Sequence, residues 1–393
     1  MASHNKLDAV HTAPSPARIP EALLPRDGRF GCGPSKIRNT QLDALHTPLL
    51  MGTSHRQSPV KNVVHEVRER LTALFGLPED WTVALGNGGA TTFWACACTS
   101  LIRQRSAHAV FGEFGQKFAD ESAASPFLLP PVIVSAPAGE VAVLDGSESS
   151  TSEVAPDVFA YPHHETSTGA ISPLQRIQGV DPSALTVVDA TSVAGGVDVD
   201  VTCTDVYYFS PQKCFASDGG LWFALMSPAA QERAEHLHRD AAATGRWMPQ
   251  ILDLSIAVKN SSKDQTLNTP AIATLVMMRE QLRWMQDQGG LTAMWMRTHA
   301  SSQTLYQWAE ASPLAQPFIR NPQWRSPVVV TIDFDPSVDA AWLASSLRAT
   351  GVVDVEPYRK LGRNQLRVGV FPSVDSLDAV ALTHCLDWLL EHR

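Results

Sequence analysis

The chain has 393 residues, of which 44% are hydrophobic and 18% charged, and its net charge is −9. This length predicts two domains, or one large α/β domain with an appendage, and the acidic balance argues against a nucleic-acid-binding protein. No stretch reaches the ~18 apolar residues of a membrane span, and the first residues lack the apolar core of a signal peptide. The six cysteines form no CxxC pair and no Cys/His ligand spacing, which favours free thiols in a reducing cytoplasm. We therefore expect a cytoplasmic globular protein with no membrane partner.

The first part of the chain alternates between strands and helices. Residues 1–29 are rich in proline and unpatterned, and we interpret them as a surface extension. Valines and leucines then recur at spacings of three and four between Val60 and Leu74, which predicts a helix that ends at Gly76 and Pro78. The next two stretches each predict a strand, a turn and a helix: WTVALGNGGATTFWACACTSLI and AHAVFGEFGQKFADESA.

The same alternation continues to residue 290. PDVFAYPHHETSTGAI predicts a strand that leads into a polar loop, and ALTVVDATSVAGG predicts a short buried strand that ends at Asp189. DVYYFSPQKCFASDGGLWFALMS predicts two strands around a loop. A long amphipathic helix is expected to begin at Thr269–Pro270 and to end at Gly289–Gly290. This order favours a mostly parallel sheet of the seven-stranded type, with helices on both faces.

The last hundred residues have a different pattern. SPVVVTIDF, GVVDVEPY and NQLRVGVF are predicted strands, and helices are expected near residues 338–349 and 376–392. We therefore predict three parts: an N-terminal extension at 1–29, a large α/β domain at 30–294, and a small α+β domain at 295–393.

Three features suggest chemistry, although each also has a plain structural interpretation. The glycine turn LGNGGATTF lies between a strand and a helix, where backbone N–H groups can hold a phosphate, or where a tight turn alone is needed. Asp189 ends a buried strand, at the edge where open α/β sheets bind ligands, or it caps the following turn. Lys213 also follows a strand, and an amine held there can form a Schiff base, whereas the alternative is a surface lysine.

The three features together suit a single ligand. Pyridoxal 5′-phosphate (PLP) needs a phosphate cradle, a carboxylate opposite its pyridinium nitrogen and a lysine for its aldehyde. It also needs an aromatic residue to stack on its ring, and Phe114, at another strand-to-helix turn, is the candidate.

From Phe30 onward the chain resembles a known family. The motifs that carry the resemblance are GCGPSKIR, TSHRQSPV, GNGGATTF, HHETSTG, VVDATS, SPQKCFASDGG, LNTP and LGRNQLRVG, in this order. In these the chain resembles the class V (fold-type I) PLP-dependent aminotransferases, and the phosphoserine aminotransferases in particular. The resemblance implies reversible transamination between glutamate and 3-phosphohydroxypyruvate in serine biosynthesis. Some relatives also act on a phosphonooxy-butanoate in vitamin B6 synthesis.

The resemblance also implies roles for residues at the cofactor. Lys213 would bind the cofactor and move the proton between Cα and C4′, and Asp189 would pair with the pyridinium nitrogen. Phe114 would stack on the ring, and Thr166 would bond near its phenolic oxygen. The expected phosphate contacts are Gly89, Ala90, Gln212 and, across a homodimer with shared active sites, Asn268 and Thr269.

On the substrate side, the expected ligands are cationic because phosphoserine is anionic at both ends. Arg367 matches the arginine that binds the α-carboxylate, and His55 and Arg56 match phosphate ligands donated by the partner subunit. Arg359, Lys360 and Arg363 occupy the region of a further phosphate-binding pair. Lys36 is a further candidate for an anion contact. The chain departs from the pattern at Ala90, where well-known relatives carry an arginine that touches the substrate phosphate.

Two other hypotheses remain open on the sequence. One is a different class V enzyme, such as an alanine–glyoxylate aminotransferase or a cysteine desulfurase, although desulfurases typically have a histidine where this chain has Gln212. The other is a phosphate- or nucleotide-binding α/β module in which Lys213 only contacts phosphate. No metal site is expected.

Overall fold

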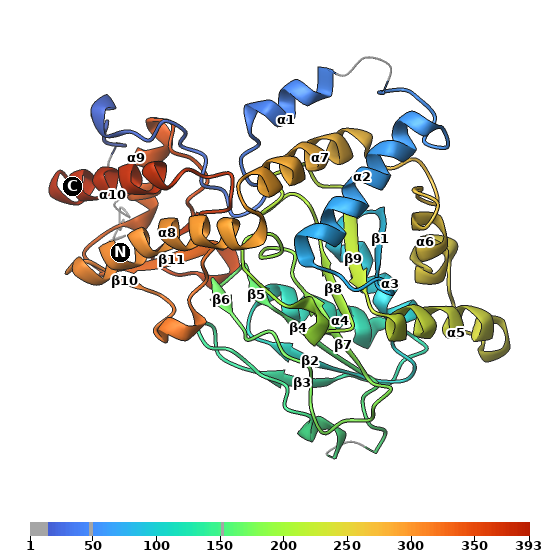
Figure 1. Cartoon of the computed structure of the whole chain (residues 1–393). Helices are drawn as coiled ribbons and strands as arrows, with labels where there is room; N and C mark the ends of the chain where they lie inside the picture. The colour runs from blue at the N-terminus through green and yellow to red at the C-terminus, as the bar shows by residue number, and fades with distance from the viewer. Residues whose placement is uncertain (1–14, 47–49, 151–152) are drawn as a thin grey trace, which may run out of the picture.

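A seven-stranded sheet forms the centre of the larger part of the molecule (Figure 1). The computed structural model describes residues 15–46, 50–150 and 153–393. Strand β9 is antiparallel to both of its neighbours, and the other neighbouring strands are parallel, which confirms the predicted mostly parallel sheet. In sheet order the strands are β1 (Thr82–Asn87), β9 (Leu221–Met226), β8 (Val206–Phe209), β7 (Leu185–Asp189), β4 (Val158–Pro162), β2 (Ser106–Val110) and β3 (Val132–Ser135).

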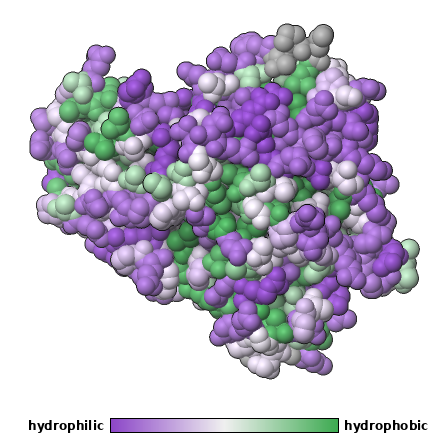
Figure 2. All heavy atoms as spheres, in the orientation of Figure 1, coloured by the Kyte–Doolittle hydropathy of each residue, from purple (hydrophilic) through white to green (hydrophobic). Residues whose placement is uncertain are grey.

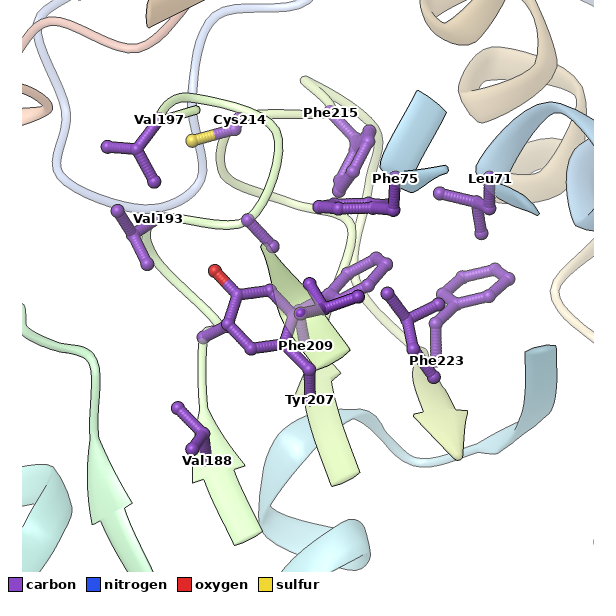
Figure 3. Packing of buried hydrophobic residues seen from close by; sticks show 14 of the residues in the cluster. Leu71, Phe75, Val188, Val193, Val197, Tyr207, Phe209, Cys214, Phe215 and Phe223 are labelled. Atoms are coloured by element: carbon purple, nitrogen blue, oxygen red, sulfur yellow. The ribbon is translucent and has the colours of Figure 1, made fainter. Parts of the chain in front are cut away.

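Helices cover both faces of this sheet, because its strands are apolar on both sides. In β8, Tyr207 and Phe209 point to one face, whereas Val206 and Tyr208 point to the other. Figure 3 shows Phe75 of α2 packed over Tyr207 and Phe209, with ring centroids 6.0 and 6.1 Å away. The first face carries α2 (Ser58–Phe75) and α7 (Ile272–Asp287), and the second carries α3 (Gly89–Ser100), α4 (Glu113–Ala124), α5 (Pro228–Thr244) and α6 (Leu254–Ser261). The helix α7 begins just after the predicted start at Thr269–Pro270.

A second, antiparallel sheet lies to one side of the first, on the left in Figure 1. It contains β10 (Ala315–Pro317), β11 (Val329–Phe334) and β12 (Gln365–Gly369), and α8 (Gly290–Ala311), α9 (Ala340–Ala349) and α10 (Ser376–Glu391) pack with it around a separate core. Ile19, from the part of the predicted extension that is described, joins this core, whereas residues 1–14 lie outside the described residues. The predicted domain boundary at 294/295 falls inside α8 and stays a prediction.

Two local predictions differ from the structure. GVVDVEPY is not a strand: it forms only a bridge between Val353 and Arg29, because Asp354 has a positive φ of 65° that ends extended pairing. The expected polar loop HHETSTG is instead buried from residue 163 to 170 and forms a small hairpin of β5 (His164–Glu165) and β6 (Ala170–Ile171). The second difference brings polar side chains into the interior beside the strand ends.

The surface is mostly hydrophilic on the face that Figure 2 shows, and hydrophobic side chains gather towards its middle. Within the described residues, no helix is long and apolar enough to cross a membrane.

Candidate active site

A cavity of about 550 Å³ lies at the carboxyl ends of β7 and β8, beside the N-terminus of α3. Parallel strands direct their carboxyl ends to one edge of a sheet, so the polar residues that follow them meet there. Seven residues predicted from the sequence line this cavity together: Gly89, Ala90, Phe114, Thr166, Asp189, Gln212 and Lys213.

The amine of Lys213 is enclosed inside the protein. The residue is only 7% exposed, and its Nζ donates a hydrogen bond to Thr166 Oγ1 at 3.0 Å and lies 5.4 Å from the centre of the Phe114 ring. Gly33 lets the backbone approach, since a Cβ there would lie 2.7 Å from Lys213 Cε. Burial, with a further contribution from Arg367, lowers the pKa of Lys213 to about 8. A large share of this amine is therefore neutral, and nucleophilic, in mildly basic solution.

The carboxylate of Asp189 is fixed by three donors. Its Oδ2 accepts hydrogen bonds from Trp94 Nε1 at 3.2 Å and from the Tyr208 hydroxyl at 2.9 Å, and its Oδ1 accepts from the Thr191 N–H at 2.9 Å. Trp94 comes from α3 and Tyr208 from β8, so helix and sheet packing hold the group. An anion held in this way at a cavity wall can stabilise a protonated ring nitrogen.

The N-terminus of α3 offers a place for an anion. Gly88 precedes the helix with φ of 109°, and its own N–H is bonded to Gly220 O at 2.9 Å. No side chain caps the helix, so the first N–H groups, at Gly89 and the following residues, face the cavity wall without an intrahelical partner. Ala90 is uncharged, so the charge at this turn is the partial positive charge of the helix N-terminus.

Three buried polar atoms on the cavity wall fit a polar ligand. Among the described residues, His164 Nε2, Thr191 Oγ1 and Gln212 Oε1 have no hydrogen-bond partner. Buried polar groups are nearly always paired, so three such atoms on one wall indicate a wall built for a ligand with several polar groups. Together with the α3 N-terminus, Asp189 and Lys213, they fit PLP.

His55, Arg56, Asn268 and Thr269 are gathered elsewhere, outside the cavity lining. Thr269 Oγ1 is 3.1 Å from His55 Nδ1, and Arg56 Nη2 donates to Leu267 O at 2.9 Å. Asn87 Nδ2 holds Asn268 Oδ1 at 2.8 Å and Thr269 O at 3.0 Å. Residues 55–56 and residues 267–269 therefore form one cluster at the end of β1.

The predicted basic residues near the C-terminus have separate positions. Arg367 Nη1 donates to Thr166 O at 2.9 Å, which places it beside the lysine contact. Arg363 is paired with Asp333 and stacks on Phe318, away from the cavity.

The other predicted cations also lie outside the cavity lining. Lys360 is paired with Glu113, and Arg359 lies exposed in a short 3₁₀ turn, Arg359–Leu361. Lys36 lies 3.5 Å from both Asp27 and Asp378 and is not part of the cavity lining.

Sequence reasoning missed the residues that support the site from neighbouring elements: Trp94, His164, Glu165, Ser192 and Tyr208. Their signal was weak, because a tryptophan on a helix or a tyrosine in a strand is most often part of the core. His164 and Glu165 stand directly before Thr166 in HHETSTG, and that adjacency was the available indication.

Comparisons with known proteins agree with this geometry. The family model for class V aminotransferases matches residues 134–354. A phosphoserine aminotransferase of Nocardioides sp. is 53% identical over 378 residues, which cover 95% of this chain and 98% of that protein. One from Rhodococcus opacus is 53% identical over 374 residues, covering 95% and 97%.

Solved structures share the fold at low identity. The phosphoserine aminotransferase of Cytophaga hutchinsonii has a TM-score of 0.82 at 19% identity, over 92% of this chain and 99% of that one. The PLP-bound phosphoserine aminotransferase of Trichomonas vaginalis has a TM-score of 0.74 at 19% identity, over 92% and 100%.

The α/β fold and the lysine cavity thus define a fold-type I enzyme that uses PLP, and the chain belongs to the class V aminotransferase family. Within that family, its nearly full-length similarity is to phosphoserine aminotransferases.

Proposed function

We propose that this enzyme transfers the amino group of glutamate to 3-phosphohydroxypyruvate, giving 2-oxoglutarate and O-phospho-L-serine for serine biosynthesis. The observation that carries the proposal is the buried, partly neutral Lys213 opposite the fixed carboxylate of Asp189, in a cavity that begins at a free helix N-terminus. The 53% identity to phosphoserine aminotransferases supports the choice of substrate.

The residues of the cavity have separate roles toward the cofactor. Bound PLP supplies an electron-accepting ring that stabilises negative charge at the substrate Cα. Lys213 holds the cofactor and then moves a proton at Cα, Asp189 keeps the ring nitrogen protonated, and Phe114 covers the ring. The α3 N–H groups at Gly89 and Ala90, with Gln212, hold the phosphate, and Thr166 positions the Lys213 amine.

The substrate needs cations, and among the described residues of this subunit no arginine lines the cavity. Arg367 lies beside Thr166 and is the candidate for the α-carboxylate. We propose that a homodimer supplies His55 and Arg56 for the distal phosphate and Asn268 and Thr269 for the cofactor phosphate. The contacts that fasten the two segments to each other support their acting as one unit. Arg359 is exposed and remains a candidate for the phosphate. Lys360 and Arg363 remain candidates only if their present ion pairs with Glu113 and Asp333 exchange.

We also propose that the enzyme is cytoplasmic, as expected for six cysteines without a metal-ligand or CxxC spacing. A second use, on a phosphonooxy-butanoate in vitamin B6 synthesis, has the same chemistry, since its substrate also combines a keto acid with a phosphate.

A competition between keto acids tests the substrate. With glutamate as amino donor, we expect kcat/KM for 3-phosphohydroxypyruvate to exceed that for pyruvate or glyoxylate by about 10² or more, because a bidentate arginine contact to phosphate is a strong, charge-assisted one. Preference for pyruvate or glyoxylate would assign the chain to a different class V activity.

A further inference from the structure

A chain of hydrogen bonds leads from the catalytic lysine to His164. Lys213 Nζ donates to Thr166 Oγ1 at 3.0 Å, and Thr166 Oγ1 donates to Ser192 Oγ at 2.8 Å. Ser192 Oγ lies 2.7 Å from His164 Nδ1. All four residues line the cavity, and each is at most 7% exposed.

The direction of these bonds fixes the tautomer of His164. The Thr166 hydroxyl accepts from Lys213, so its own hydrogen goes to Ser192. The Ser192 hydroxyl has two acceptors within reach, His164 Nδ1 at 2.7 Å and His164 O at 3.4 Å, and we assign its hydrogen to the nearer one, Nδ1. A neutral ring that accepts at Nδ1 carries its hydrogen at Nε2. Burial, with the nearby Lys213, His163 and Arg367, holds the pKa of His164 well below its usual value, so the ring is neutral.

The Nε2–H group of His164 has no partner among the described residues, although it is buried at the cavity wall. An N–H group left in this state is costly, whereas an acceptor oxygen of a ligand would satisfy it. The cofactor phosphate is assigned to the N-terminus of α3, so the other anionic oxygens expected in this cavity are the ring oxygen of the cofactor and the α-carboxylate of the amino acid.

We propose that His164 is a ligand-contacting residue, whose neutral Nε2–H donates a hydrogen bond to an anionic oxygen in the cavity and is oriented through Ser192 and Thr166 by Lys213. The inference rests on the proposed function and deepens it, because it adds a donor to the site. The contact places no charge in the cavity, so it orients an oxygen without competing with Arg367 as a cation.

Two substitutions at His164 distinguish the contributions of its two ring nitrogens. His164→Asn puts an amide near Nδ1, where it can still bond Ser192, and removes the donor at Nε2. His164→Gln extends an amide towards Nε2 and restores a donor there. His163→Asn is the matched control, because His163 is equally buried and bonds Tyr207 at 3.1 Å but does not line the cavity.

Two dissociation constants are measured. That of PLP is monitored by the visible absorption of the cofactor without substrate, and that of glutamate by the spectral change on its addition. If the contact is to the cofactor, His164→Asn should weaken PLP binding and shift its absorption. If the contact is to the amino acid, His164→Asn should weaken glutamate binding and leave the affinity for PLP unchanged. We expect about a tenfold loss in one of these constants, a partial recovery in His164→Gln, and wild-type constants in His163→Asn.

The inference would be overturned if His164→Asn kept the wild-type dissociation constants for both PLP and glutamate, or if His163→Asn weakened binding as much as His164→Asn does. Urea unfolding of each variant separates a folding defect from a lost contact. If His164→Asn does not fold, His164→Ala, which also removes the Nε2 donor, is compared with His163→Ala in its place. A wild-type protein that did not bind PLP at all would instead refute the proposed function.

Discussion

The lysine amine is the residue around which this site is organised. Burial of Lys213 against Phe114 and Gly33 penalises the charged form, so its pKa falls to about 8. Among the described residues, its hydrogen-bonding side chain is the neutral Thr166, which does not offset this penalty with a charge. Asp189 lies at the opposite wall and keeps its own charge balanced by donors rather than by the lysine. The amine therefore stays available as a nucleophile and a base.

The lowered pKa of Lys213 predicts how cofactor binding depends on pH. The protonated amine cannot attack an aldehyde, so in cofactor-free protein the rate of PLP attachment should rise with pH through about 8 and then level off. A stopped-flow absorbance series checks this, with N-acetyl-lysine as the reference amine. A rate that kept rising to about pH 10, as for an exposed lysine, would contradict the buried setting.

At the residue scale, the sequence predicted the residues that lie at strand ends, because the hydrophobic pattern of a strand shows where the strand stops. Lys213, Asp189 and Thr166 belong to this group. Trp94 and Tyr208 could not be predicted in the same way, since their contact with Asp189 arises only when α3 packs on β8. His164 was not predicted, because it lies in a stretch that was expected to be a polar loop.

At the scale of elements, Glu165 joins the β5–β6 hairpin to α4. Its carboxylate is fully buried and accepts hydrogen bonds from the N–H groups of Phe114 and Gly115, at 2.9 and 3.1 Å, at the first turn of the helix. Its other oxygen accepts from the N–H and hydroxyl of Ser167. The charge suits a helix N-terminus and fixes Phe114 on one side and Thr166 on the other.

We expect Glu165→Gln to loosen this junction. An amide replaces one acceptor oxygen by a donor, so at least one backbone N–H loses its acceptor whichever way the amide turns. The free energy of unfolding should fall by about 1–3 kcal/mol in urea. Glu69→Gln, an exposed change on α2, is the control, and equal stability of the two variants would show that the junction contributes nothing.

Among the elements, the predicted helices α2, α3, α4 and α7 and the predicted strands β1, β2, β4, β7, β8 and β9 are present, because their hydrophobic patterns are clear. Strand β3 and helices α5, α6 and α8 were not predicted. GVVDVEPY failed because a positive φ at Asp354 stops pairing, and apolar spacing does not reveal a local backbone turn. The surroundings of HHETSTG were not predicted because its polar residues bond partners in other elements, such as Tyr207 and Ser192, which is a tertiary effect.

For the whole molecule, the described subunit gathers most of the predicted cofactor residues in the cavity but leaves four predicted phosphate ligands outside it. His55, Arg56, Asn268 and Thr269 form one cluster at the end of β1, and Ala90 brings no charge to the glycine turn. A symmetric dimer that carries this cluster to the partner's cavity would complete both sites at once. The sequence resemblance suggested this arrangement, and a single chain cannot display it.

Mixed dimers test the sharing of sites. One subunit carries Lys213→Ala and the other carries His55→Ala with Arg56→Ala, each with its own affinity tag. If sites are shared, the purified mixed dimer has one complete site and recovers about half of the wild-type activity, whereas both parent dimers are impaired. Activity no higher than that of the parents would mean that each subunit uses its own His55 and Arg56.

The central claim is that Lys213 holds the cofactor, and one measurement tests it directly. The holoenzyme is reduced with borohydride, digested, and searched by mass spectrometry for a lysine that carries the reduced cofactor. The site described above predicts the label on Lys213 alone among the eight lysines of the chain, and its loss in Lys213→Ala. A label on another lysine, or no label on protein that contains bound PLP, would contradict it.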